Sequence, residues 1–153
     1  MKRMWSKNEL KEIVKGTQGY NFANLVDAEG HPRFIEGNIT IGEKEGVSQL
    51  YGKWSLSGSH LMIVICFTIA NGTALSGGLA DINLPKWILD KIVPITSNVV
   101  EYKAVATFDS SINSQNMSTA LRKATAKLTL ECGITATADR TARYTCDLLI
   151  DNE

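Results

Sequence analysis

The stretch that most constrains the fold runs from His60 to Asn71 and reads His-Leu-Met-Ile-Val-Ile-Cys-Phe-Thr-Ile-Ala-Asn. It is the only long apolar run in the chain, and it is rich in β-branched and aromatic residues, which favour packed strands. A transmembrane helix needs about 20 apolar residues, so this run is too short to cross a bilayer. It predicts a strand that is buried on both faces at the centre of a β-domain.

The segment before this run predicts its partner strand. Leu50, Trp54 and Leu56 share one face in the alternating pattern of residues 49–57. A Gly-Ser pair at residues 58–59 then separates the two strands, and glycine supplies the positive φ that a tight hairpin turn needs. We therefore expect an antiparallel hairpin here.

Apolar and polar residues also alternate along much of the remaining chain. These further segments are residues 34–41, 99–108, 118–124, 127–132, 134–138 and 143–151. Together with the hairpin they give about eight strands with turns roughly every 8 to 12 residues, which is the spacing of β-sandwiches and barrels. We expect a mainly β fold, an antiparallel β-sandwich of the jelly-roll kind.

Two short helices are expected beside the strands. Ser6 and Glu9 form a capping box at the start of an amphipathic N-terminal helix, which Gly16 ends. A proline at the first helical position starts a second helix at residues 85–92. We expect this second helix to plug one end of the β-core, with Trp87 as part of the plug rather than as a platform for sugars.

The chain is thus expected to divide into an N-terminal helix at residues 1–16, a turn-rich linker at 17–33 and a β-sandwich domain at 34–153. A helix of about ten residues is marginal alone and has to dock on a surface. It packs either on its own β-domain or against other chains, and the sequence leaves both arrangements open. In the second arrangement the oligomer or assembly contacts are Met4, Trp5, Leu10, Ile13 and Val14.

Composition narrows the range of functions. The 153 residues include 16 Lys plus Arg and 16 Asp plus Glu, so the formal net charge is zero. A nucleic-acid partner requires a basic excess or stripe, so we expect none. Neutrality favours self-association. The N-terminal residues contain no apolar signal-peptide region, so we expect cytoplasmic synthesis without secretion by a signal peptide.

The sequence carries no motif for a metal, a cofactor or catalysis. Cys66, Cys132 and Cys146 are odd in number and lie in apolar patterns, which predicts reduced and buried side chains. His31 and His60 have no ligand partner after them at the spacing of a metal site. We expect no metal, no cofactor and no enzymatic activity.

Two pairs of polar residues could suggest a functional site. Asp27 and Glu29 are two carboxylates without a third ligand, so we expect a solvated turn rather than a cation site. Ser59 and His60 place a nucleophile next to a base. Adjacent residues of a strand point to opposite faces, so we do not expect them to share a site.

Five segments together resemble a known kind of protein. They are residues 33–37 (Arg-Phe-Ile-Glu-Gly), 51–62 (Tyr-Gly-Lys-Trp-Ser-Leu-Ser-Gly-Ser-His-Leu-Met), 80–88 (Ala-Asp-Ile-Asn-Leu-Pro-Lys-Trp-Ile), 138–140 (Ala-Asp-Arg) and 147–151 (Asp-Leu-Leu-Ile-Asp). On these segments the chain resembles small tail and baseplate proteins of phages and prophages of Gram-positive bacteria.

The resemblance implies a non-enzymatic structural or receptor-binding module of the virion tail or baseplate. It implies a homo-oligomer, with a trimer favoured, whose N-terminal helix serves attachment to other virion tail proteins. It implies no membrane insertion. Tail tips of this type often bind host cell-wall polysaccharide, although none of the quoted segments carries a sugar-binding motif.

Two other functions stay open at this point. A small-ligand-binding β-barrel, closed by the helix at residues 85–92, would need a continuous apolar cavity. A hydrolase of cell-wall glycans would need two carboxylates about 5 to 9.5 Å apart in a cleft. The strand patterns place most acidic residues singly and outward, so the hydrolase ranks last.

Overall fold

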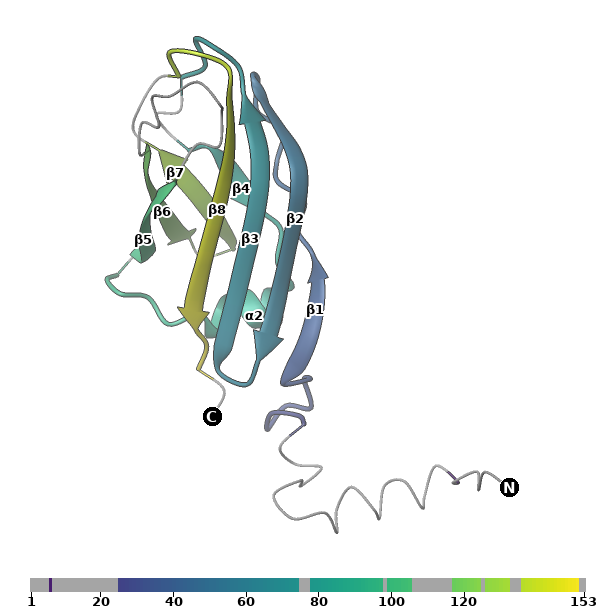
Figure 1. Cartoon of the computed structure of the whole chain (residues 1–153). Coiled ribbons are helices and arrows are strands. Elements are labelled where there is room, and N and C mark those ends of the chain that lie inside the picture. Colours follow the sequence, from purple (N-terminus) through teal and green to yellow (C-terminus); the bar gives the residue numbers. More distant parts are fainter. Residues whose placement is uncertain are drawn as a thin grey trace.

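The computed structural model describes Ser6 and residues 25–74, 78–97, 99–105, 117–124, 126–132 and 136–151. In this part of the chain, eight strands form two antiparallel sheets (Figure 1). The first sheet has the order β1 (Phe34–Asn38), β2 (Val47–Ser57), β3 (His60–Ile69) and β8 (Arg140–Leu149). The second has the order β4 (Ala80–Ile82), β7 (Lys127–Cys132), β6 (Met117–Ala124) and β5 (Val99–Val105). The prediction of a mainly β, antiparallel sandwich is confirmed.

The first sheet combines three consecutive strands with the distant strand β8, whereas the second is built from four consecutive strands. β8 joins the first sheet beside β3, and β4 joins the second beside β7. This order differs from that of a jelly roll, because consecutive strands here pair with each other instead of alternating between the sheets. β5 and β8, at the edges of the two sheets, contact each other and close one side of the sandwich.

The opposite side of the sandwich is closed by the residues that follow β1, where the chain crosses from the first sheet to the second. The Ile39 amide still donates to the Gly52 carbonyl of β2 (3.0 Å), whereas Ile41 pairs with Ile82 of β4. The Gln49 side chain holds this crossing, because its Nε2 donates to the Ile39 carbonyl (2.6 Å) and its Oε1 accepts from the Ile41 amide (2.8 Å). One side chain thus satisfies two backbone groups where the chain changes sheets.

The hairpin of β2 and β3 is confirmed. Ser57 pairs with His60 across a two-residue turn, and Gly58 has a φ of 63°. Only Gly58 of the turn has a positive φ, which is the pattern of a type II′ turn. The strand ends at Ile69, before the turn at residues 71–72, and not at Asn71 as the apolar run suggested.

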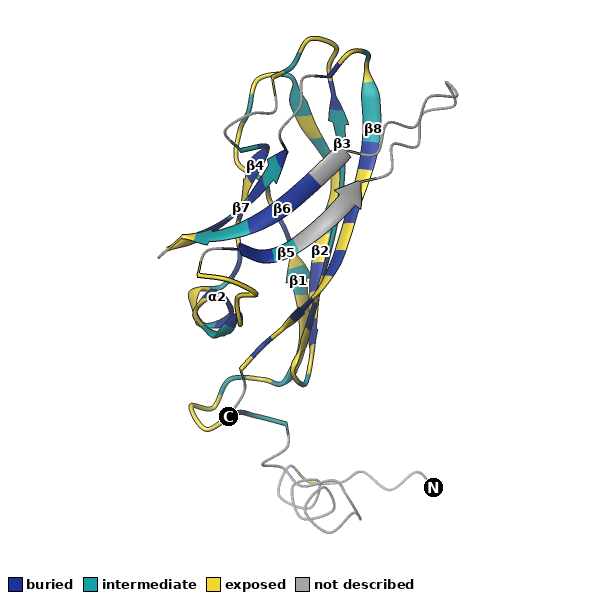
Figure 2. Cartoon of the chain, turned by 90° about the vertical axis from the view of Figure 1, so that its left-hand side faces the viewer, coloured by how far each residue is buried: buried dark blue, intermediate teal, exposed yellow. Residues whose placement is uncertain are grey.

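Burial along β3 alternates. Its inward residues are Leu61, Ile63, Ile65, Phe67 and Ile69, and each is at most 1% exposed. Burying one such side chain contributes about 1.5–3 kcal/mol. On the opposite face Met62 is 46% exposed, and Val64 and Cys66 are half-buried. The prediction of burial on both faces was wrong, because a two-layer sandwich covers only one face of each sheet. Figure 2 shows the same alternation along β8.

A β-bulge corrects the expected faces of β2. Trp54 and Leu56 are buried as predicted. The pairing with β3 shifts between Gln49 and Tyr51, so the residue between them leaves the alternating register. Leu50 is therefore 61% exposed instead of inward.

The short helix α2 (Lys86–Lys91) follows Pro85, which occupies the N-cap position. Ile88 and Leu89 are buried, so the helix plugs one end of the core as expected (Figure 1). Ile92 then pairs with Ile150, which ties the end of the helix to the end of β8.

Several predictions fall outside the described residues. They are the N-terminal helix, its contact residues Met4, Trp5, Leu10, Ile13 and Val14, and most of the linker at 17–33. Residues 136–138 form no strand, so the described part of the strand expected at 134–138 is not confirmed. Within the described residues, no helix is both long and apolar enough to span a membrane.

None of the three cysteines forms a disulfide. Cys132 and Cys146 are buried, as predicted, whereas Cys66 is only half-buried because its side chain lies on the outer face of the first sheet.

Candidate functional site

A tight loop precedes β1 and presents several polar groups. Val26 pairs with Pro32, and the Asp27 amide donates to the His31 carbonyl (2.9 Å). Asp27 Oδ1 accepts from the amides of Glu29 (2.9 Å) and His31 (2.8 Å), which is an Asx turn. Gly30 takes the positive φ of 87° that the turn requires.

The loop is fastened to α2 by an ion pair. Lys91 Nζ lies 2.5 Å from Asp27 Oδ2, and the two side chains are 16% and 1% exposed. The Lys91 hydrogen bond holds the pKa of Asp27 well below its usual value, and hydrogen bonds from His31 and Glu29 act in the same direction. The hydrogen bond to Asp27 raises the pKa of Lys91. The pair is therefore fully charged at neutral pH.

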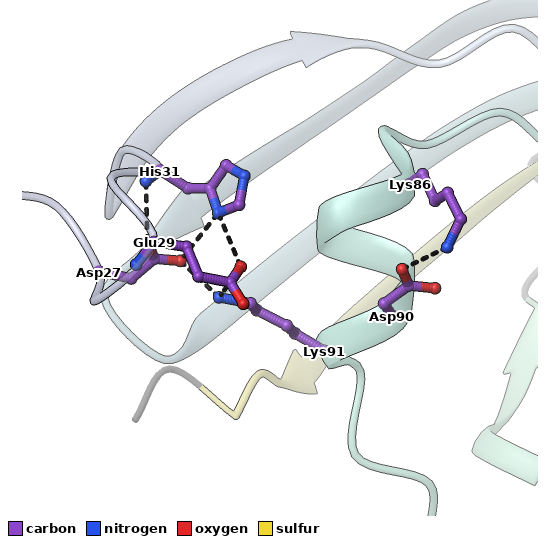
Figure 3. A network of polar contacts seen from close by, with 6 residues as sticks. All are labelled: Asp27, Glu29, His31, Lys86, Asp90 and Lys91. Atoms are coloured by element: carbon purple, nitrogen blue, oxygen red, sulfur yellow. Dashed lines mark hydrogen bonds and ion pairs between the residues drawn. The ribbon is translucent and has the colours of Figure 1, made fainter.

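His31 completes the contact between the loop and the helix. Its Nδ1 lies 3.2 Å from Asp27 Oδ2 and 3.3 Å from Glu29 Oε2 (Figure 3). Its ring stacks on Trp87, with ring centroids 4.5 Å apart and planes 1° apart. We call Asp27, Glu29, His31, Trp87 and Lys91 the loop–helix clasp. Trp87 also packs against the core, in line with its predicted place in the plug.

The clasp has the donor atoms of a metal site but not the vacancy for a metal. Ligand atoms of Asp27, Glu29 and His31 lie within 4.8 Å of one another. However, Lys91 Nζ is 2.5 Å from Asp27 and 3.5 Å from Glu29, so an ammonium group already occupies the position of a cation. A metal would have to displace this charge. The clasp is thus a structural joint, and the expectation of a solvated turn was wrong for Asp27.

Asp27 does not have the character of the general acid of a glycan hydrolase. Such an enzyme needs a general acid whose pKa is raised. The pKa of Asp27 is lowered, and its carboxylate is buried against Lys91. His60 lies elsewhere, exposed at the start of β3, with its Nδ1 3.6 Å from Asp147.

Three hollows lined by described residues are open depressions. One is lined by residues near 44–46 and 70–74, one by Glu29 and residues 90–94, and one by residues 40–42 and 81–84. None of these three is the enclosed apolar cavity that a ligand-binding barrel would need.

The outer face of the first sheet is a candidate binding surface. In Figure 1 it faces the viewer, and no described element covers it. The cross-strand register places on it the following side chains: Phe34, Glu36 and Asn38 of β1; Tyr51, Lys53, Ser55 and Ser57 of β2; His60, Met62, Val64, Cys66 and Thr68 of β3; Thr141, Arg143, Thr145, Asp147 and Leu149 of β8. Phe34, Tyr51, Met62 and Leu149 are each 46–60% exposed. We refer to this surface as the outer face.

Comparisons with known proteins add no relative. No family model, no curated protein and no solved structure matches this chain.

Sequence reasoning found the outer face only in part and missed the clasp. The apolar residues of β3 predicted burial on both of its faces, but not the contributions of Phe34 and Leu149 to the outer face. The clasp did leave one local signal, since Asp27 lies four residues before His31 in a loop that contains Gly30. Its Lys91 partner lies 64 residues further along the chain, so no sequence window joins them.

Proposed function

We propose that this protein is a non-enzymatic structural module of a phage tail or baseplate that associates with copies of itself. The observation that carries the proposal is the apolar strip of the outer face. Met62 is 46% exposed on an inner strand of a four-stranded sheet, and Val64 and Cys66 continue the strip. Sheet faces that meet only water normally carry polar residues, so this strip favours a protein partner.

Two further points support a structural role. Among the described residues, the clasp is the polar cluster whose side chains could best serve catalysis or bind a metal. Its charged groups, however, contact one another. The resemblance of five segments to tail and baseplate proteins indicates the assembly in which such a module would serve. Attachment to host cell-wall polysaccharide rests on that resemblance alone. Trp87 is no open sugar platform, because His31 stacks on its ring.

The experiment is a protein inventory of phage particles. Phage particles are induced from the source strain, purified by density and analysed by mass spectrometry. The genes that flank the gene for this protein are identified in parallel. The proposal expects the protein in intact particles at a fixed ratio to known tail proteins, with tape-measure or baseplate genes nearby. Its absence from particles that contain their other tail proteins would refute the proposal.

A further inference from the structure

We infer that the outer face pairs with the outer face of a second copy, with the strands of the two copies antiparallel about a two-fold axis near Val64. This inference deepens the proposed function, because it names the surface and the partner of the self-association. The occupant is a second copy, and the argument rests on the apolar centre, the charge layout and the area of the face.

The apolar centre of the face lies on β3. Met62, Val64 and Cys66 follow one another on this inner strand, between Ser55, Lys53 and Tyr51 of β2 and Asp147, Thr145 and Arg143 of β8. An apolar centre inside a polar rim is the usual anatomy of a protein interface.

The charges of the face are separated along the strands. Glu36 and Asp147 lie in the row that contains Met62, nearer the hairpin turn. Lys53 lies in the next row and Arg143 in the row after it. One half of the face is thus acidic and the adjoining half basic.

This layout selects one of the two face-to-face arrangements. In an antiparallel pair with the axis in the row of Val64, Asp147 of each copy meets Arg143 of the other, and Lys53 lies in the axis row. In a parallel pair Glu36 and Asp147 of the two copies oppose each other, and such like-charge contacts are costly. Arg143 forms no ion pair with any described residue, so its charge is available to a partner.

The face is large enough for a stable contact. Strands of ten residues, such as β3 and β8, extend about 33 Å at about 3.3 Å per residue, and four strands span roughly 19 Å. The plan area is on the order of 600 Å², and the relief of the side chains adds to it. Stable interfaces bury about 600 to 1,000 Å² per partner, so the face reaches the lower end of that range when nearly all of it is covered.

A cross-linking experiment tests the position of the axis. Sheets packed face to face are about 10 Å apart, too far for a disulfide, so a short bis-maleimide is the suitable reagent. Val64→Cys in a Cys66→Ser background should give mostly covalent dimer at micromolar concentration. Glu45→Cys in the same background, at an exposed turn off the face, should stay uncross-linked. Equal cross-linking of the two variants would overturn the inference.

Charge reversal tests the direction of the strands. Wild-type protein should show twice the chain mass of 16.7 kDa in light scattering. Asp147→Lys and Arg143→Glu should each weaken the dimer at least tenfold in Kd, and the double variant should regain most of the loss. Circular dichroism checks that each variant is folded. Weakening by both single changes without regain in the double variant would overturn the antiparallel arrangement.

The outcomes separate this inference from the proposed function. A monomer at 100 µM, or a trimer that Val64→Glu leaves intact, would overturn the pairing. If the protein is nevertheless found in phage particles, the proposed function stands without the pairing. If the antiparallel dimer forms but particles lack the protein, the pairing stands and the virion role fails.

Discussion

Lys91 Nζ lies 2.5 Å from Asp27 Oδ2, and this contact joins the loop before β1 to the helix that plugs the core. The Asp27 carboxylate is buried, and its other oxygen accepts two backbone amides of its own loop. A single side chain thus orders the loop and fastens it to α2. Substitutions of Asp27 should therefore destabilise both the loop and its attachment to α2.

Asp27→Asn tests the charge of this contact, because the amide keeps an acceptor for the loop and removes the partner of Lys91. We expect the melting temperature to fall by several degrees, since a half-buried ammonium loses its closer and buried counter-ion and keeps only the exposed Glu29. Asp90→Asn is the matched control on the same helix. It breaks the exposed Lys86–Asp90 pair (2.5 Å) and should change the melting temperature little (Figure 3). Equal effects of the two substitutions would contradict a special role for Asp27.

The stabilisation by Asp27 should depend on pH in a defined direction. The pKa of Asp27 is lowered in the folded state, so its contribution is complete above the unfolded value of about 4 and is lost as the pH falls through the folded pKa. The pKa of Lys91 is raised, so its contribution is complete below about 10.5 and is lost as the pH rises above that value. The difference in melting temperature between wild type and Asp27→Asn should be flat from about pH 5 to 9 and shrink outside this range. A difference that grows toward low pH would contradict this assignment.

Gly37 should not tolerate alanine, because it faces the indole ring of Trp54 across the β1–β2 pair. A Cβ at this position would lie 2.6 Å from three atoms of that ring, and Trp54 is only 5% exposed and cannot move aside freely. We expect Gly37→Ala to lower the free energy of unfolding by about 1–3 kcal/mol in urea denaturation.

Gly42→Ala is the control for this prediction. Its Cβ would lie 3.5 Å from the Asp81 Cβ, an ordinary contact, and its φ is not positive. We expect a change within about 0.5 kcal/mol. Trp54→Phe should reduce the cost of Gly37→Ala in a double-mutant cycle, because the smaller ring leaves room for the methyl group. An additive cycle would show that the ring is not the obstacle.

Gln49 should matter more than its place on a surface strand suggests. Gln49→Ala removes two hydrogen bonds from backbone groups of Ile39 and Ile41, which we expect to cost about 2 kcal/mol in the free energy of unfolding. Gln49→Glu should also destabilise, because a carboxylate oxygen replaces the donor that faces the Ile39 carbonyl. Ser48→Ala, on the exposed neighbour, should change stability by less than about 0.5 kcal/mol. A glutamate variant as stable as wild type would show that the two hydrogen bonds are not what holds the crossing.

Local signals explain what the sequence predicted. Gly58 and the alternation on both sides of it specify the hairpin, because the turn and the register lie within a few residues of each other. Pro85 and the spacing after it specify α2 for the same reason. These features depend on neighbours along the chain, so one sequence is enough to find them.

Contacts between residues far apart in the chain explain the features that the sequence did not predict. The bulge that exposes Leu50 occurs beside Gln49, whose side chain bonds to a segment ten residues away. The ion pair that buries Asp27 needs a helix 64 residues distant. The run at β3 indicated burial on both faces, because apolar composition alone does not distinguish a core layer from an exposed outer face.

Cys66 provides a probe of that face in the unmodified protein. It is half-buried on the outer face, whereas Cys132 and Cys146 are 3% and 1% exposed, so one thiol per chain should react quickly with a thiol reagent before denaturation. If copies pair through this face, the labelling rate of Cys66 should fall as the protein concentration rises. Val64→Glu should remove that dependence by opposing two carboxylates near the axis. A wild-type labelling rate that is constant across the concentration range would show that the face stays open in solution.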